Sequence, residues 1–204
     1  MPTQFRRRIY NINEFKAAID DAFAHLPDMK RAMHAGRVDK AFSERIMLAV
    51  TQVNGCRYCS YGHTKAALSA GLTPEEIQAL LAGEFSDAPP EQLPALLFAQ
   101  HYAESEGNPD PEAWRRLVET YGPETAQDIL ANIRMIMVGN LSGNTFDALL
   151  YRLTFRAIAP NSSLLQEAGV IFGSLVIIPA AAIRYFRKRR RTKVTGWQDD
   201  RVTR

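Results

Sequence analysis

The sequence predicts an all-α protein, and three observations support that prediction. Apolar residues recur every three or four positions along most of the chain, as in INEFKAAIDDAFAHL, where Phe15, Ile19 and Phe23 share one helical face. Serine, threonine or aspartate precedes several of these segments and glycine follows them, which is typical of helix ends. No segment alternates apolar and polar residues over the length of a strand, so no sheet is expected.

Seven amphipathic segments follow one another, and we expect helices at approximate residues 12–26, 43–53, 55–70, 73–84, 91–106, 111–121 and 123–157. Ser43 is the expected N-cap of the second helix, and Gly55 is its expected end. The fourth begins with the pattern of a capping box, with Thr73 at the N-cap and Glu76 three residues later.

The last of these helices is interrupted by Gly139 and Gly143, where we expect it to bend. On the same segment Asn140, Asn144 and Asp147 project from one narrow face. Because buried polar groups need partners, we interpret this face as hydrogen bonding between helices or subunits. The alternative is that it lines a functional cleft. The aromatic side chains of Tyr61 and Phe146 are assigned to the core.

The C-terminal region differs from the rest of the chain. Residues 159–163, APNSS, have the composition of a linker, which separates a helical domain at 1–158 from a segment at 164–204. Within that segment, sixteen residues from Ala168 to Ile183 carry no charge, and the basic run RYFRKRRR follows. A spanning helix needs about twenty apolar residues, so the length argues against a span, whereas the basic run suits an anionic cytoplasmic leaflet. Two interpretations stay open: a membrane surface bound through residues 168–191, or a helix docked on the bundle or a partner subunit.

Charge is unevenly distributed along the 204 residues. Residues 184–204 hold nine Lys/Arg and two Asp, whereas the preceding residues hold sixteen basic and twenty acidic side chains. The body therefore offers no basic face for nucleic acid. No apolar run follows the N-terminal arginines, so no secretory signal is expected. Two cysteines do not make a secreted disulfide scaffold, and we expect a cytoplasmic protein, either free or attached to the cytoplasmic side of a membrane.

The segment GCRYCSYGH, residues 55–63, contains both cysteines and a histidine four residues after the second. On a helix, Cys56, Cys59 and His63 project within a sector of about 60°. The pair also stands at the expected start of a helix, where unpaired N–H groups and the positive end of the dipole stabilise a thiolate. Since the thiolate is the reactive form of cysteine, this arrangement favours redox chemistry.

The cysteine pair has two other interpretations. A structural zinc site needs about four ligands, and this motif supplies three, which leaves a three-ligand catalytic metal as an alternative. The remaining three histidines of the chain have no ligand spacing relative to the motif. A purely structural pair of buried cysteines leaves the histidine on the same face unexplained. We therefore expect neither a metal nor another bound cofactor.

Glu44 is a candidate fourth member of the group. It lies twelve residues before Cys56, near the expected start of the preceding helix. A carboxylate there could orient an imidazole that removes a proton from a thiol. The other interpretation is a first-turn acid that complements the helix dipole, and the spacing alone favours this second role.

Residues 43–77, SERIMLAVTQVNGCRYCSYGHTKAALSAGLTPEEI, resemble the AhpD-like alkylhydroperoxidases of the carboxymuconolactone decarboxylase superfamily. The shared pattern is an acid, a C-x-x-C pair that begins twelve residues later, and a histidine four residues beyond it. Glu44, Cys56, Cys59 and His63 fit this pattern. The resemblance extends as a helical register over roughly residues 10–157 and implies an AhpD-like bundle, with the C-terminal apolar helix and basic tail as additions. It also implies assembly into trimers or larger oligomers.

The resemblance implies reduction of hydroperoxides by a redox-active Cys56–Cys59 disulfide. Cys59 would attack the peroxide, Cys56 would resolve the sulfenic acid, and His63 with Glu44 would relay protons. The implied reductant is a lipoyl-bearing or thioredoxin-like protein. The dipole argument, by contrast, makes Cys56 the more acidic thiol, because it lies nearer the helix start.

Two features qualify the resemblance. Some members carry a histidine directly before the second cysteine, where this chain has Tyr58, and a phenol is a poor base at neutral pH. The decarboxylase branch lacks the cysteine pair, which argues against lactone decarboxylation. The alternative function is a non-catalytic redox sensor or scaffold attached to a membrane, in which the thiols report oxidant without consuming it.

Overall fold

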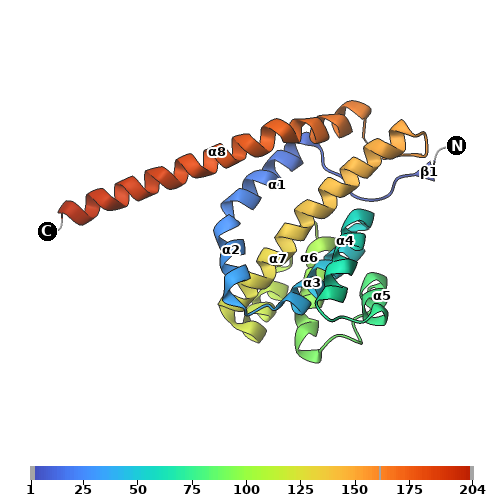
Figure 1. Ribbon diagram of the computed structural model, residues 1–204, viewed down its shortest axis with the longest axis horizontal. Helices are drawn as coiled ribbons and strands as arrows, with labels where there is room; N and C mark the ends of the chain where they lie inside the picture. Colours follow the sequence, from blue (N-terminus) through green and yellow to red (C-terminus); the bar gives the residue numbers. More distant parts are fainter. Residues whose placement is uncertain (1–2, 161, 203–204) are drawn as a thin grey trace.

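The computed structural model describes residues 3–160 and 162–202, with side chains to residue 188 in the last helix, and its described part is almost entirely helical (Figure 1). The elements are β1 (Thr3–Gln4), α1 (Ile12–Ala24), α2 (Leu26–Ala35), α3 (Lys40–Asn54), α4 (Arg57–Ser69), α5 (Pro74–Ala82), the 3-10 turn η1 (Pro90–Gln92), α6 (Leu93–Glu104), α7 (Pro111–Leu153), β2 (Ala157–Ile158) and α8 (Leu164–Val202). The all-α prediction is confirmed.

Helix α3 is the centre of the bundle. It packs against α4, α5, α6 and α7, and Ile46, Leu48 and Val50 have no exposed surface. The apolar side chains of this helix are buried against several neighbours, and their burial contributes to the hydrophobic stabilisation of the core. Residues carried by α3 are consequently held in fixed positions relative to four other helices.

The start of α3 differs from the prediction. Asp39, not Ser43, is the N-cap, and its carboxylate accepts a hydrogen bond from the Phe42 N–H at 2.7 Å. The Ser43 hydroxyl instead donates to Asn132 Oδ1 at 2.6 Å. The helix therefore begins about a turn earlier than expected, and Glu44 lies beyond its first turn. Its end is as predicted, with Gly55 in the left-handed conformation at φ 68°.

The start of α5 forms half of the predicted capping box. The Thr73 hydroxyl accepts the Glu76 N–H at 3.2 Å, as expected. The Glu76 carboxylate does not return to the cap; it accepts a hydrogen bond from Arg45 Nε of α3 at 2.6 Å. An ion pair between two helices has replaced the local contact.

Helix α7 consists of two segments joined at Gly122, whose backbone angles (φ 77°, ψ 160°) are not helical, and Pro123 starts the second segment. The predicted break between residues 121 and 123 is confirmed. Gly139 and Gly143 do not interrupt the helix, because the backbone keeps helical angles through both. The helix ends at Leu153 rather than at 157.

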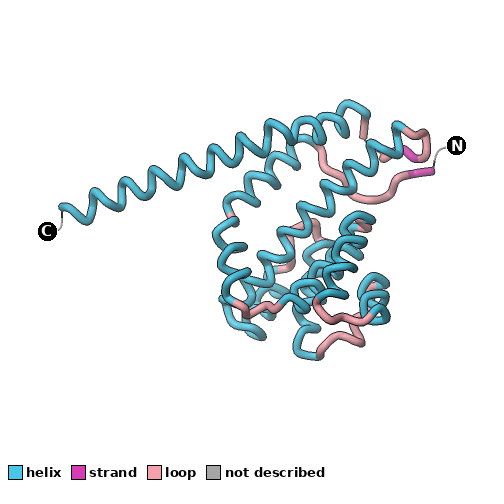
Figure 2. Tube along the Cα trace, in the orientation of Figure 1, coloured by secondary structure: helices cyan, strands magenta, loops and turns pink. Residues whose placement is uncertain are grey.

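Residues 157–158 leave α7 altogether and pair in parallel with residues 3–4 (Figure 2). Such a short strand has no periodicity that a sequence can display, so the prediction of no strand missed it. Helix α2 was also missed. Only Ala32 of that helix is buried, and its apolar pattern is correspondingly weak.

Helix α8 runs along one side of the molecule and extends beyond it, packed against α1 and α7 (Figure 1). Residues 164–188 are long and apolar enough to cross a membrane: an 18-residue window within them has a mean hydropathy of 1.8, and only 11% of that window is buried. This helix is longer than the sixteen uncharged residues counted from the sequence, because it also contains Glu167, Arg184 and apolar residues beyond them. Length and composition of this kind also occur in core helices of soluble proteins.

Candidate functional site

Cys56 is the N-cap of α4, not a residue inside the helix. Its backbone is extended (φ −73°, ψ 106°), and its sulfur accepts the Cys59 N–H at 3.3 Å. The helix expected at 55–70 therefore begins at Arg57, and Cys56 caps it instead of lying within it. Because an N-cap residue satisfies one of the unpaired N–H groups at the helix start, its sulfur lies where a negative charge is stabilised.

The pKa values of the two thiols are shifted in opposite directions. A hydrogen bond from the Cys59 thiol, together with the backbone N–H groups of Cys59 and Tyr58, lowers the pKa of Cys56 to about 6, although burial opposes the shift. The same contact with Cys56, together with burial, raises the pKa of Cys59. These directions agree with the dipole argument. Cys56 is fully buried, whereas Cys59 is partly exposed, so the more acidic sulfur is also the less accessible one.

Glu44 and His63 form a hydrogen-bonded pair between α3 and α4. The distance from His63 Nδ1 to Glu44 Oε2 is 2.7 Å, and Glu44 is only 8% exposed. The first-turn dipole role favoured by spacing is therefore wrong for Glu44. A carboxylate accepts only, so Nδ1 carries the proton and Nε2 is left as a proton acceptor. His63 lies one turn beyond Cys59 on the same face of α4.

Helix α7 forms a wall of the site at Gly143. A Cβ atom added to Gly143 would lie 2.7 Å from the Cys56 sulfur and 3.8 Å from the Cys59 sulfur. Real Cβ atoms essentially never approach a neighbour as closely as the first of these distances. The absence of a side chain at position 143 therefore lets the helix backbone contact both thiols.

The polar face of α7 fixes the position of that wall. The Asn144 amide donates to the backbone carbonyl of Asn54 at 2.8 Å, and Asn140 Oδ1 accepts a hydrogen bond from the Thr51 hydroxyl at 3.1 Å. Both bonds join α7 to the last two turns of α3, directly before Cys56. Hydrogen bonding between helices, the favoured interpretation of this face, is thus found within one chain, and it also adjoins the thiols.

Asp147, the third polar residue on this face of α7, is fully buried and pairs with two arginines near the thiols. It forms ion pairs with Arg7, at 2.7 Å, and with Arg57, and it accepts the Tyr58 hydroxyl at 3.1 Å. Tyr58, which replaces the histidine of some family members, therefore links α4 to α7. Arg7 also donates to the carbonyl of Gly55 at 3.3 Å and contributes to the low pKa of Cys56.

Sequence reasoning identified Glu44, Cys56, Cys59 and His63, but not Gly143 and Arg7. Gly143 was noted only as an interruption of a helix, and Arg7 is separated from Cys56 by almost fifty residues with no pattern that links them. The assignment of Tyr61 and Phe146 to the core is wrong, because both are exposed. The Phe146 ring lies 5.9 Å from that of Tyr58 at the surface beside the thiols.

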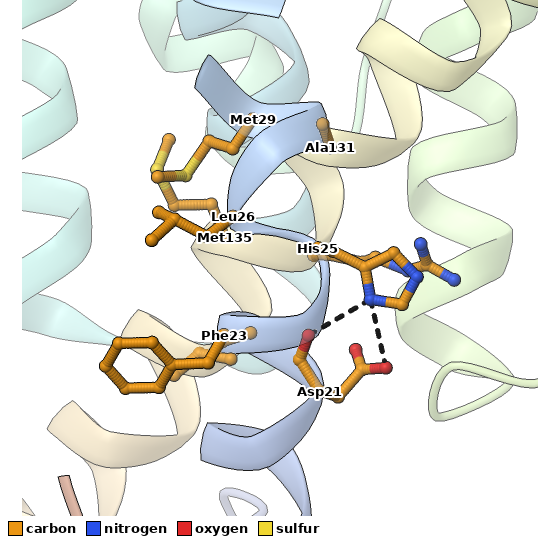
Figure 3. Close-up of a pocket in the computed structure, with 10 residues that line it drawn as sticks. Asp21, Phe23, His25, Leu26, Met29, Ala131 and Met135 are labelled. Atoms are coloured by element: carbon orange, nitrogen blue, oxygen red, sulfur yellow. Dashed lines mark hydrogen bonds and ion pairs between the residues drawn. The ribbon is translucent and has the colours of Figure 1, made fainter. Parts of the chain in front are cut away.

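An apolar cavity of about 230 Å³ lies elsewhere, between α1, α2 and α7 (Figure 3). Leu26, Met29 and Met135 lie on one side of it, and the polar residues Asp21 and His25 bond to each other at 3.2 Å. None of the four predicted site residues lines this cavity. We therefore place the candidate site at the thiols and not in this cavity.

Comparisons with known proteins agree with the pattern of the motif. A model of the carboxymuconolactone decarboxylase family matches residues 19–104, a range that includes all four predicted site residues. Uncharacterized protein YdfG of Bacillus subtilis (strain 168) is 31% identical over 112 residues, which are 53% of this chain and 76% of that protein. Uncharacterized protein 4 in cox locus of Paracoccus denitrificans is 41% identical over 61 residues, which are 30% of this chain and 53% of that protein. No solved structure matches.

Proposed function

Because the chain belongs to the carboxymuconolactone decarboxylase family, we propose that it is an AhpD-like, thiol-dependent hydroperoxide reductase that cycles Cys56 and Cys59 between dithiol and disulfide. One observation carries the proposal. The acidic Cys56 sulfur accepts the N–H of Cys59, and His63, one turn further along α4, is hydrogen-bonded to Glu44 of α3. A carboxylate–imidazole pair beside two thiols is the arrangement that activates a sulfur nucleophile.

The roles of the two sulfurs follow from their acidity and exposure. The first proton lost by the pair leaves Cys56 as the thiolate, and Cys59 keeps the second proton. A peroxide reaches the partly exposed Cys59, but this thiol needs a base because its pKa is raised. We assign that task to Nε2 of His63, with Glu44 holding the imidazole in the required tautomer.

The proposed reaction then has two steps. The Cys59 thiolate attacks the terminal oxygen of the hydroperoxide, the O–O bond breaks, and Cys59 becomes a sulfenic acid. The departing alkoxide takes the proton held by His63 and leaves as an alcohol. The Cys56 thiolate next attacks the Cys59 sulfur, which forms the disulfide and releases hydroxide, and hydroxide becomes water on protonation.

A dithiol partner closes the cycle. Its first thiolate attacks the Cys56–Cys59 disulfide to form a mixed disulfide, and its second thiol releases the reduced pair. Two electrons and two protons pass from the partner to this chain. The dithiol class includes lipoyl-bearing and thioredoxin-like proteins, and we propose a partner of that kind.

The proposal is tested by counting thiols in the full-length protein. One equivalent of tert-butyl hydroperoxide should remove both free thiols of the chain, and dithiothreitol should restore them. Cys56→Ser should stop at a sulfenic acid that dimedone traps, because no resolving thiol remains. His63→Ala should slow the oxidation, whereas His34→Ala, which alters an exposed histidine of α2, should not. An unchanged thiol titre contradicts the proposal. Oxidation of the remaining thiol in Cys59→Ser at the same rate as thiol oxidation in the wild type also contradicts it.

A second measurement separates the reductase from the redox sensor. With excess hydroperoxide and excess dithiothreitol, the reductase consumes many peroxide molecules per chain. A sensor, whose disulfide must persist to report oxidant, should add little to the peroxide consumption of dithiothreitol alone. Consumption no faster than that background would favour the sensor over the function proposed here.

A further inference from the structure

Helix α8 carries two apolar stripes on opposite sides. Its buried side chains, which include Glu167, Val170 and Ala181, project toward α1 and α7 within a sector of about 60°. On the other side lie the apolar residues that are more than half exposed: Leu165, Phe172, Leu175, Val176, Ile183 and Phe186. These six project within about 100° of one another, roughly opposite the buried stripe. A surface helix of a soluble protein normally has a polar outer face, and α8 does not.

The inner stripe is docked along the whole described length of the apolar segment. Near its start, Glu167 is fully buried, and both of its carboxylate oxygens pair with Arg152 of α7 at 2.8 Å. Near its end, the Tyr185 ring packs against Phe23 of α1 at 6.1 Å. Arg184 also forms an ion pair with Asp20. A helix that crossed a bilayer would have to leave these contacts and break the buried ion pair of Glu167 with Arg152, which is costly.

We propose that α8 lies flat on an anionic membrane surface, with its inner stripe still docked on α1 and α7 and its outer stripe inserted among the lipids. The distribution of charge in the sequence favours an anionic membrane as the partner of this face. Five consecutive basic residues at 187–191 follow the apolar segment, and such clusters bind anionic headgroups. The chain before residue 184 has four more acidic than basic side chains, so an anionic surface repels the body and attracts this end of α8.

The connection that leads into α8 has the same character. Phe155 is 90% exposed and is one of two non-glycine residues with positive φ in the described chain, at 55°. Leu165, ten residues later, is 85% exposed. A strained backbone that presents a phenylalanine to solvent is unfavourable for a free surface and is offset when the ring enters lipid.

The test is co-sedimentation of the full-length protein with vesicles of phosphatidylcholine alone, or of phosphatidylcholine with about one third phosphatidylserine. We expect binding to the anionic vesicles and weakening by salt. The double variant Leu175→Glu/Val176→Glu should bind at least about tenfold more weakly, because two apolar side chains no longer enter the bilayer. Leu97→Glu is the matched control on α6, where a half-exposed leucine should tolerate the same change without loss of binding.

The basic run provides a second, independent variant. Arg189→Gln/Arg190→Gln/Arg191→Gln should weaken binding to anionic vesicles on the order of a hundredfold, since each basic residue near the surface contributes a factor of about five. Binding that does not depend on phosphatidylserine, or that survives both sets of substitutions, overturns the proposal.

Orientation and occupant are tested separately. In a Cys56→Ser/Cys59→Ser background, Asp20→Cys and Arg184→Cys joined by a short bismaleimide lock α8 to α1. The locked protein should still bind vesicles, and loss of binding on locking would mean that α8 must undock. Light scattering measures the molar mass of the Leu175→Glu/Val176→Glu variant. A fall in mass with unchanged vesicle binding would identify a second copy of the chain as the occupant and refute the membrane proposal.

Discussion

We call the group of Glu44, Cys56, Cys59 and His63 the thiol corner. The thiol corner and helix α8 both pack against α7, but the two regions place polar and apolar side chains in opposite ways. At the thiol corner, polar and ionisable groups lie inside the protein, where Asp147 and Glu44 each have partners within hydrogen-bonding distance. On α8, large apolar side chains lie outside it. Both arrangements are unfavourable for folding alone, because buried polar groups lose hydration and exposed apolar groups gain contact with water. The comparison supports the two proposals made above, a hydroperoxide substrate at the corner and a membrane surface at α8.

The two regions should differ most clearly when one buried carboxylate in each is replaced by an amide. Glu167→Gln removes the charge that pairs with Arg152 and should destabilise the protein by about 3 kcal/mol, the lower end for a broken buried ion pair. The lower end applies because the Arg152 side chain is 18% exposed. Urea unfolding measures the loss. The rate at which peroxide oxidises the thiols, per folded molecule, should stay the same. A parallel fall in that rate would mean that α8 and the thiol corner are not independent.

At the thiol corner the matching change is Glu44→Gln. The amide no longer fixes the proton on Nδ1 of His63, so thiol oxidation should slow by about a hundredfold, as expected for loss of an oriented base. Stopped-flow measurement of thiol loss gives the rate, and circular dichroism checks that the helices persist. Equal rates for Glu44→Gln and the wild type would exclude the relay and leave Glu44 as a packing residue.

The two regions also differ in the room for a methyl group at a glycine of each. Gly143→Ala places a methyl group 2.7 Å from the Cys56 sulfur and should cost about 1–3 kcal/mol through overpacking, with slower thiol oxidation. Gly169→Ala, on α8, meets nothing within 4 Å and should instead stabilise the protein by about 0.5–1 kcal/mol, because alanine favours the helix. Chemical denaturation of the two variants side by side measures both signs, and the same sign for both would contradict the close approach of α7 to the thiols.

The smallest expected effect concerns the charge beside Cys56. The pKa of Cys56, about 6, predicts that thiolate absorbance in the ultraviolet falls with a midpoint near that pH as acid is added. Arg7→Gln should move the midpoint upward by a fraction of a pH unit, because the arginine is the weakest of the named causes that favour the thiolate. Arg6→Gln, an exposed neighbour, should leave it in place. A downward shift in Arg7→Gln would show that the charge does not act on this sulfur.

The helices were predictable where local signals are strong. The glycine after α3, the threonine cap of α5 and the break between residues 121 and 123 follow from backbone preferences of single residues, which act without the rest of the fold. Helix α2 and the paired residues 157–158 were missed because their stability comes from contacts with distant segments, not from their own periodicity. The start of α3 was misplaced because Ser43 and Asp39 are both good caps, and packing selected the earlier one.

By itself, the sequence determined the all-α class, the C-x-x-C pair at a helix start and the histidine one turn beyond it, because spacing within one helix fixes direction. Only the tertiary structure decided that Glu44 meets His63 and that Gly143 closes on Cys56. It also decided that the outer face of α8 is apolar and exposed. Those outcomes depend on how helices far apart in the chain pack on one another, and helical periodicity carries no information about that packing.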